Sequence, residues 1–302
     1  MIEVDVVIVG GGPAGLTAAI YLSRFLLRTV VFDGGDGRAL MIPISHNHAG
    51  HPAGIAGRVL VDRMRVQAME YGAKLVESVV TKIEIEDKGF RIEAGETLRA
   101  RAVLLATGVY NNRPAMDDVL HAEAVAKGRL RYCPICDGFE VTDKRIAVIG
   151  SGSRGTREAV FMRSFSNDIT LVAPTGPHAP NEEQQTTLAK AGVTVVDGPA
   201  TQFRIDTESI SFESAASRLS FDAIYPALGS AVRSGLARDI GVGLCEDGCI
   251  RVDTHQRTSV KGVYAAGDVV PGLDQISSAM GEAGVAATSI RNDLAAVRPL
   301  RR

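Results

Sequence analysis

Residues 4–25 have the sequence VDVVIVGGGPAGLTAAIYLSRF, a short apolar run joined to a helical pattern by Gly-x-Gly-x-x-Gly. In this fingerprint the glycines permit a tight turn, let the backbone approach a pyrophosphate, and bring the helix against the strand. Residues 144–165, KRIAVIGSGSRGTREAVFMRSF, repeat the arrangement. One such motif is a weak signal. Two copies, each after an apolar run and before a helical pattern, predict an α/β protein with two Rossmann-like, three-layer dinucleotide-binding domains.

The first fingerprint is followed by the acid that such a site needs. The next apolar run ends in Asp33, 18 residues after Gly15, close to the spacing of the carboxylate that binds a ribose. Two glycines follow Asp33, so a plain turn residue is the alternative interpretation.

The segments between the motifs predict further helices and strands. Helical patterns cover residues 55–71, 182–191 and 276–294. Apolar or alternating runs predict strands near residues 79–86, 90–94, 97–100, 102–108, 221–230 and 260–270. From about residue 231 the chain returns to the plan of its first part. We therefore expect a discontinuous domain of residues 1–114 and 231–302, with residues 115–230 inserted as a second domain.

Composition excludes several classes of function. The 302 residues are 45% hydrophobic and 23% charged, which is usual for a globular protein. A net charge of −2 without a basic run disfavours nucleic-acid binding. No apolar run approaches the roughly 20 residues of a membrane span. The N-terminus has no basic region before its first strand, so no signal peptide and a cytoplasmic location are expected.

The stretch CPICDG, residues 133–138, carries a candidate redox centre. Cys133 and Cys136 form a Cys-x-x-Cys pair, which in a reducing compartment is more often catalytic or metal-binding than structural. A helix beginning here would stabilise a thiolate. A zinc site usually needs four ligands, which makes zinc the weaker interpretation. The remaining alternative is that both cysteines are simply small buried residues.

Together these features resemble the low-molecular-weight thioredoxin reductase family of flavoproteins over essentially the whole chain. The resemblance depends on GGGPAG, ATG, CPICDG, GSGSRG and AAGD with Gln275. It implies FAD in the discontinuous domain, and NADPH with the redox cysteines in the inserted one. It also implies a homodimer and, as substrate, a thioredoxin-like protein or a small disulfide or dithiol.

The resemblance also implies roles for individual residues. The FAD contacts it implies are Gly10, Gly12, Gly15, Asp33, Asn47, Thr107, Gly108, Asp268 and Gln275. It places Cys136 on the flavin side and Cys133 in exchange with the substrate, and it makes Asp137 the acid that protonates the leaving thiolate. Family members often have Arg before the glutamine, where this chain has Asp274. The electrostatics of the flavin site are therefore expected to differ.

The second fingerprint lacks the residues that select NADPH. In NADPH-using members a basic cluster, typically His-Arg-Arg, follows the next strand, because arginine suits the 2′-phosphate. This chain has APTGPH at residues 173–178, with no acid for NAD either. Arg154 and Arg157 are the nearby basic residues, and each is either a phosphate contact or solvent-exposed. This loss resembles branches that are independent of pyridine nucleotides or linked to two flavins.

Several functions therefore stay open. Gly150, Gly152 and Gly155 are expected to bind a second dinucleotide of uncertain identity. We favour an FAD-dependent thiol–disulfide oxidoreductase whose NADPH site is degenerate, with ferredoxin as electron donor or a second FAD in that site. The alternatives are an ordinary NADPH-dependent thioredoxin reductase, an oxygen-using dithiol oxidase and a flavin redox sensor. A sensor would not need Asp137.

Two further groups could carry chemistry. His46, His48 and His51 lie within one glycine-containing loop, where we favour polar residues around the flavin or at a dimer surface over a metal site or a catalytic base. Cys245 and Cys249 flank Glu-Asp-Gly, which predicts a hairpin turn. We favour spare thiols there over a regulatory disulfide.

Overall fold

The computed structural model describes residues 2–215 and 217–300, and its contacts divide the chain into two compact units. Unit 1 comprises Met1–Leu40, Ala56–Tyr110 and Ala231–Arg302, and unit 2 comprises Met41–Ile55 and Asn111–Ser230. The chain passes between the units on either side of residues 41–55, and again at β7 (Val109–Asn111) and β15 (Ser230–Val232). Residues 41–55, which the sequence placed in the first domain, group with unit 2. The predicted domains themselves stay a prediction.

Unit 1 is built on a seven-stranded sheet. Its strands are β1 (Ile2–Val9), β2 (Thr29–Asp33), β3 (Lys74–Glu77), β4 (Lys82–Glu86), β5 (Gly89–Ala94), β6 (Glu96–Leu105) and β16 (Val263–Ala265). The order is β3-β2-β1-β6-β5-β4, with β16 also paired to β6. The β4–β5–β6 part is antiparallel and confirms the predicted meander, whereas the other pairs are parallel.

β6 corrects one prediction. The sequence suggested two strands, near 97–100 and 102–108, but a single strand runs from Glu96 to Leu105. Its first half pairs with β5, where Phe90 faces Ala100, and its second half pairs with β16, where Val263 faces Val103. The change of neighbour explains why the burial pattern changes from partly exposed to continuously buried along one strand.

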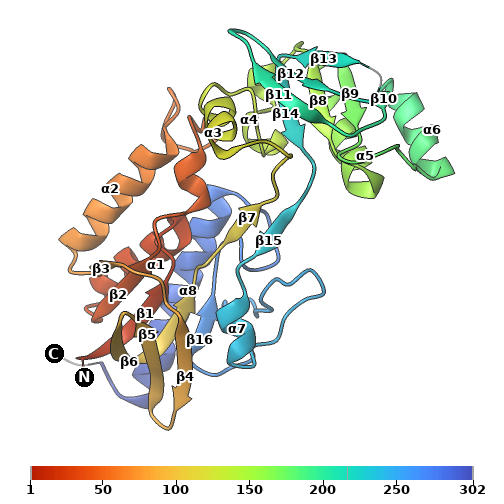
Figure 1. Ribbon diagram of the computed structural model, residues 1–302. Helices are drawn as coiled ribbons and strands as arrows, with labels where there is room; N and C mark the ends of the chain where they lie inside the picture. Colours follow the sequence, from red (N-terminus) through yellow and green to blue (C-terminus); the bar gives the residue numbers. More distant parts are fainter. Residues whose placement is uncertain (1, 216, 301–302) are drawn as a thin grey trace. The chain divides into compact units, whose positions relative to one another are not determined.

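Helices complete unit 1. They are α1 (Pro13–Arg24), the short η1 (Arg38–Met41, whose last residue is in unit 2), α2 (Gly57–Glu70), α7 (Gly235–Asp239) and α8 (Ile276–Val297). α1 packs against both α2 and α8, and Figure 1 shows α1 beside α8. The inward faces of α1 and α8 are rich in alanine, which lets the two helices approach closely. The fingerprint helix is thus held between two others.

Unit 2 repeats the plan with a smaller parallel sheet. The order is β10 (Thr194–Val196), β9 (Ile169–Val172), β8 (Ile146–Ile149) and β14 (Ala223–Pro226). Its helices are α3 (Asp118–Ala126), α4 (Pro134–Asp137), η2 (Phe139–Val141), α5 (Gly152–Met162) and α6 (Glu182–Ala191). A separate antiparallel sheet contains β11 (Thr201–Ile205), β12 (Ile210–Glu213) and β13 (Arg218–Phe221). Every residue of β8, β9 and β14 is buried, as in parallel strands covered on both faces.

The predicted α/β class is confirmed, with one fingerprint in each unit. The helices predicted over 182–191 and 276–294 are present as α6 and α8, and the helix predicted over 55–71 is α2. Within residues 2–215 and 217–300, the structure has no helix with the length and apolar character needed to cross a membrane.

Candidate functional site

The first fingerprint forms a cradle in unit 1. Gly10 has a φ of +113°, and a Cβ there would lie 2.2 Å from the carbonyl oxygen of Ala106. A Cβ on Gly15 would lie 1.9 Å from the carbonyl oxygen of Gly10, so both positions are closed by backbone. Gly12, in contrast, faces open space, with nothing within 4 Å of its Cβ position. A close turn with an open middle glycine at a helix N-terminus fits a pyrophosphate.

The second fingerprint, in unit 2, also has a closed first and last glycine and an open middle one, but its positive φ is at Gly152 rather than at the first glycine. A Cβ on Gly155 would lie 2.7 Å from the carbonyl carbon of Gly150, and one on Gly150 would lie 2.8 Å from the Cβ of Ala227. Gly152 again faces open space, with a φ of +57°. The turn at the start of α5 therefore keeps the shape of a dinucleotide site.

Asp33 lies at the first cradle. It ends β2, and a Cβ added to Gly11 would lie 2.3 Å from its Oδ2 atom. The same Oδ2 accepts a hydrogen bond from Nη2 of Arg65 at 2.5 Å, and Oδ1 accepts one from the amide of Gly35 at 3.0 Å. Arg65 was missed by the sequence analysis, because its approach to Asp33 depends on how α2 packs against α1. The carboxylate is held in place for a hydroxyl donor such as a ribose.

Asp268 also lies beside this cradle. A Cβ on Gly267 would lie 2.9 Å from the Cβ of Ala14, in the first turn of α1. Nη1 of Arg38 contacts Oδ2 of Asp268 at 3.0 Å and Oδ2 of Asp274 at 2.9 Å. Burial and the nearby Asp274 raise the pKa of the Asp268 carboxyl, and Arg38 opposes this shift. The structure therefore joins residues from three separate stretches of sequence at one place.

The other predicted flavin contacts are distributed as follows. Thr107 and Gly108 follow β6, and the Thr107 hydroxyl donates to the carbonyl oxygen of Arg233 at 2.7 Å. Gln275 is the N-cap residue of α8. Asn47 lies in unit 2, where its Oδ1 accepts from the Ser45 hydroxyl at 3.0 Å. All predicted flavin residues except Asn47 thus belong to unit 1.

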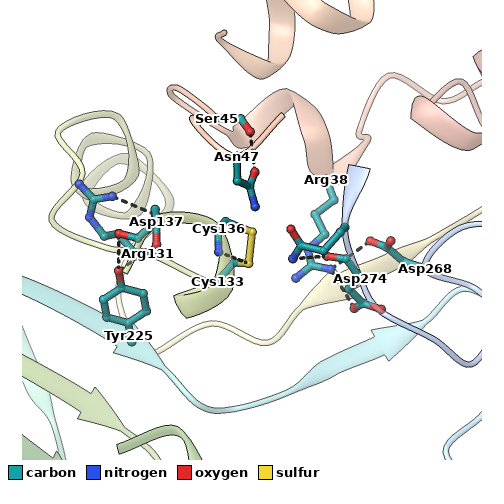
Figure 2. Close-up of a disulfide and its surroundings, with 11 residues drawn as sticks. Arg38, Ser45, Asn47, Arg131, Cys133, Cys136, Asp137, Tyr225, Asp268 and Asp274 are labelled. Atoms are coloured by element: carbon teal, nitrogen blue, oxygen red, sulfur yellow. Dashed lines mark hydrogen bonds and ion pairs between the residues drawn. A yellow bond between two sulfur atoms is a disulfide. The ribbon is translucent and has the colours of Figure 1, made fainter. Parts of the chain in front are cut away.

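A disulfide joins Cys133 and Cys136 in unit 2, with their Cα atoms 5.2 Å apart (Figure 2). Cys133 is the N-cap of α4, and Pro134 occupies the first helical position, where its missing amide costs no hydrogen bond. The amide of Cys136 donates to the sulfur of Cys133 at 3.1 Å. Both cysteines are partly exposed. The pair is therefore accessible, and a backbone donor favours negative charge on Cys133.

Asp137 is held next to this disulfide by two donors (Figure 2). Nη1 of Arg131 donates to its Oδ2 at 2.9 Å, and the hydroxyl of Tyr225 donates to its Oδ1 at 2.8 Å. Burial raises the pKa of the Asp137 carboxyl, while Arg131 and Tyr225 act in the opposite direction. The raised pKa moves the titration of Asp137 towards neutral pH, as a general acid requires.

The sequence analysis missed both donors. A tyrosine inside the buried strand β14 is the available signal, because a buried hydroxyl needs a partner. Arg131 stands two residues before Cys133, but nothing in its spacing points to Asp137.

The loop after β9 is folded onto the chain around Gly198. Ala173 is fully buried, and a Cβ on Gly198 would lie 2.2 Å from its carbonyl oxygen. The amide of His178 donates to Oδ1 of Asp197 at 2.8 Å. Burial lowers the pKa of the His178 imidazole, so this side chain is mostly uncharged at neutral pH. The loop therefore offers no cation for a 2′-phosphate.

Acidic residues follow this loop. Glu182 and Glu183 occupy the exposed first turn of α6, and Gln184 there donates to the hydroxyl of Ser153 in the fingerprint turn at 3.2 Å. Arg154 lies against Gly229, where a Cβ would be 3.0 Å from its Cζ atom, and Arg157 is exposed. Arg154 and Arg157 thus both belong to α5, the helix of the second fingerprint.

The histidine loop and the second cysteine pair show no assembled site. The rings of His48 and His51 stack at 5.4 Å, and burial together with His51 lowers the pKa of His48. Among the described residues, no three metal-ligating side chains are grouped. Cys245 and Cys249 are free thiols. The amide of Cys245 donates a hydrogen bond to the carbonyl oxygen of Cys249 at 2.8 Å, which confirms the predicted turn between them. Burial and Asp247 raise the pKa of Cys249 to about 11.

Comparison with known proteins decides the family. Residues 4–283 match the family described as pyridine nucleotide-disulphide oxidoreductase. The chain is 34% identical over 281 residues to the thioredoxin reductase of Mycolicibacterium smegmatis, with 88% of each chain covered. It is 32% identical over 282 residues to that of Streptomyces coelicolor, covering 88% of this chain and 86% of the relative. The chain belongs to the thioredoxin reductase family.

The solved structure of thioredoxin reductase from Giardia duodenalis supports this placement. It is 27% identical, has a TM-score of 0.85, and covers 98% of this chain and 100% of its own. As a member of the thioredoxin reductase family, the protein is an FAD-dependent disulfide oxidoreductase, and the family usually also uses NADPH. The open space at Gly12 and the fixed carboxylate of Asp33 fit FAD in unit 1. The individual contacts to FAD stay predictions.

Proposed function

We propose that the protein exchanges electrons between FAD and a disulfide or dithiol substrate through Cys133–Cys136, and that its second dinucleotide site does not use NADPH efficiently. The observation that carries the first part is the partly exposed disulfide beside Asp137, which two donors hold in place. The loop of residues 173–181, without a charged cation, supports the second part.

In the reducing direction, the Cys133 thiolate attacks one sulfur of the substrate disulfide. A mixed disulfide forms, and Asp137 gives a proton to the thiolate that leaves. Cys136 then attacks the sulfur of Cys133, which releases the second substrate thiol and restores the Cys133–Cys136 disulfide. When bound and reduced, the flavin would supply the electron pair that returns this disulfide to the dithiol.

The surface beside the disulfide favours a protein substrate. Ile135, between the two cysteines, is 54% exposed, and Phe139, three residues after Cys136, is 80% exposed. Two large apolar side chains in and after the redox pair therefore face solvent. Exposed aromatic and aliphatic side chains next to a reactive group suit a contact with a protein surface. We propose a thioredoxin-like protein as substrate, in agreement with the relatives named thioredoxin reductases.

Replacement of Phe139 by alanine tests this substrate. Loss of a central aromatic contact should raise KM for a thioredoxin-like protein by about tenfold, with little change for a small aromatic disulfide. The matched control is Val119→Ala, which removes another apolar side chain of unit 2 that is 80% exposed. Equal effects of Phe139→Ala on both substrates would exclude a protein-docking role.

The occupant of the second site decides the electron donor. If the site holds a second FAD, heat-denatured holoprotein should release about two FAD per chain. Release of about one FAD leaves an empty site with a donor such as ferredoxin, or NADPH. The NADPH-dependent alternative is favoured by Arg154 and Arg157, because either could meet a phosphate from α5. A homodimer is proposed from the family resemblance alone, and the cytoplasmic location stays the expectation drawn from the sequence.

A further inference from the structure

Unit 1 gathers three carboxylates where the cofactor is expected. Asp268 follows β16, Asp274 directly precedes the N-cap of α8, and Glu282 in α8 accepts a hydrogen bond from the amide of Gly267 at 2.8 Å. Each of Asp268 and Glu282 feels repulsion from neighbouring carboxylates in addition to burial. Such a cluster is unfavourable beside an anionic ligand.

The cluster borders the fingerprint. Gly267 lies against Ala14 in the first turn of α1, two residues after the open position at Gly12. Asp268 follows Gly267 directly, so its carboxylate lies near the place where the pyrophosphate of a dinucleotide is expected. A flavin dinucleotide brings negative charge to this place, and the carboxylates there need a compensating cation.

Arg38 supplies that cation from a distant part of the sequence. A single atom, Nη1, contacts both Asp268 and Asp274 at 3.0 and 2.9 Å. In the described residues, Nη2 and Nε of Arg38 make no hydrogen bond, so they keep donor capacity for a ligand. The Arg38 side chain is only 23% exposed, and its two ion pairs fix its position.

We infer that Arg38 is the positioned cation of the flavin site and that Asp274 and Asp268 hold it there. The family resemblance implies an arginine directly before the glutamine that is Gln275 here. In this chain the positive charge comes from position 38, and an aspartate at position 274 is its counter-ion. This inference rests on FAD binding in unit 1 and is independent of which donor or substrate is used.

The test is a set of charge variants measured for FAD binding to apoprotein and for the flavin midpoint potential. Arg38→Gln should weaken the FAD Kd by about tenfold or more, which corresponds to loss of one charged contact. It should also make the potential more negative, because a removed cation no longer stabilises the added electrons. Arg38→Lys keeps the charge and should lie between Arg38→Gln and the wild type in both readouts.

The decisive variant moves the positive charge from position 38 to position 274. Arg38→Gln combined with Asp274→Arg removes the cation at position 38 and places one before Gln275. We expect it to recover most of the lost affinity and of the potential, whereas a merely structural role of the Arg38 ion pairs would leave the double variant at least as impaired as Arg38→Gln. If Arg38→Gln fails to fold, the double variant is compared with the wild type and with Arg38→Lys instead, and an FAD Kd far weaker than that of Arg38→Lys would contradict the inference.

The matched control is Arg257→Gln. Arg257 forms a more exposed ion pair in unit 1, with Asp293 near the end of α8 rather than its start. Its loss should leave the FAD Kd and the potential unchanged. Wild-type affinity and potential in Arg38→Gln would overturn the inference while leaving the FAD assignment intact. Wild-type apoprotein that binds no FAD would overturn both.

Discussion

Asp137 illustrates how a single side chain is prepared for proton transfer. Burial disfavours its charged form, while Arg131 and Tyr225 each stabilise the carboxylate by a hydrogen bond. The balance leaves the pKa above its ordinary value, although both oxygens are occupied by donors. The sequence predicted the acid from its place after Cys136, but the two donors come from other segments, and only their packing reveals them.

Tyr225→Phe should move the pH profile of disulfide turnover. The hydroxyl favours the carboxylate, so its removal raises the pKa of Asp137 further. A general acid is active below its pKa, where it is protonated, and this activity is lost as the pH rises through the pKa. The alkaline limb of the pH–rate profile should therefore shift to higher pH. Steady-state rates between pH 5 and 9 measure this shift.

Tyr132→Phe is the matched control for Tyr225→Phe. It removes another tyrosine hydroxyl of unit 2, one that bonds His121 at 2.7 Å and does not contact Asp137. Each variant should cost about 1 kcal/mol of unfolding free energy, as is usual for one hydrogen bond. An unmoved limb in Tyr225→Phe, or the same shift in both variants, would contradict the assigned role of Asp137.

At the scale of elements, the fingerprint turns were predictable and their surroundings were not. The glycine spacing is local, so the sequence alone indicated β1–α1 and β8–α5 with their phosphate-binding turns. The two ion pairs at the first cradle, Arg65 with Asp33 and Arg38 with Asp268, depend on contacts between segments far apart in sequence. For the same reason the sequence predicted two strands where the structure has the single strand β6. This strand changes its partner from β5 to β16 within the sheet, and the change leaves no break in the sequence.

The contrast between Gly12 and Gly15 tests the cradle. Gly12→Ala meets no protein atom, so the apoprotein should keep its unfolding free energy within about 1 kcal/mol. The added methyl group occupies the open space, however, and should weaken the FAD Kd by about tenfold or more.

Gly15→Ala should instead destabilise the apoprotein by about 1–3 kcal/mol, because its Cβ would lie 1.9 Å from the Gly10 oxygen. Chemical denaturation and fluorescence titration with FAD distinguish the two. Wild-type FAD affinity in Gly12→Ala would show that the cofactor does not occupy this space.

At the scale of the whole molecule, the chain uses one plan twice with different outcomes. Unit 1 keeps both the phosphate-binding turn and the carboxylate at the end of its second strand. Unit 2 keeps the turn and adds the Cys133–Cys136 disulfide, but its second strand leads to a buried alanine and to a histidine whose pKa is lowered by burial. The sequence predicted this asymmetry, because the missing basic cluster is a local feature. It did not predict that residues 41–55 group with unit 2, which depends on tertiary contacts.

The source of electrons is the central question for this molecule, and anaerobic reduction of the flavin addresses it most directly. Oxidised holoprotein is mixed with one equivalent of NADPH, and the flavin absorbance is followed in a stopped-flow instrument. A variant with Pro174→Arg and Thr175→Arg, which places two cations on the loop after β9, is the positive control and should respond faster than the wild type. For the wild type, we expect slow bleaching or none, with no advantage of NADPH over NADH. Rapid, stoichiometric bleaching by NADPH would contradict the account and identify an ordinary NADPH-dependent enzyme.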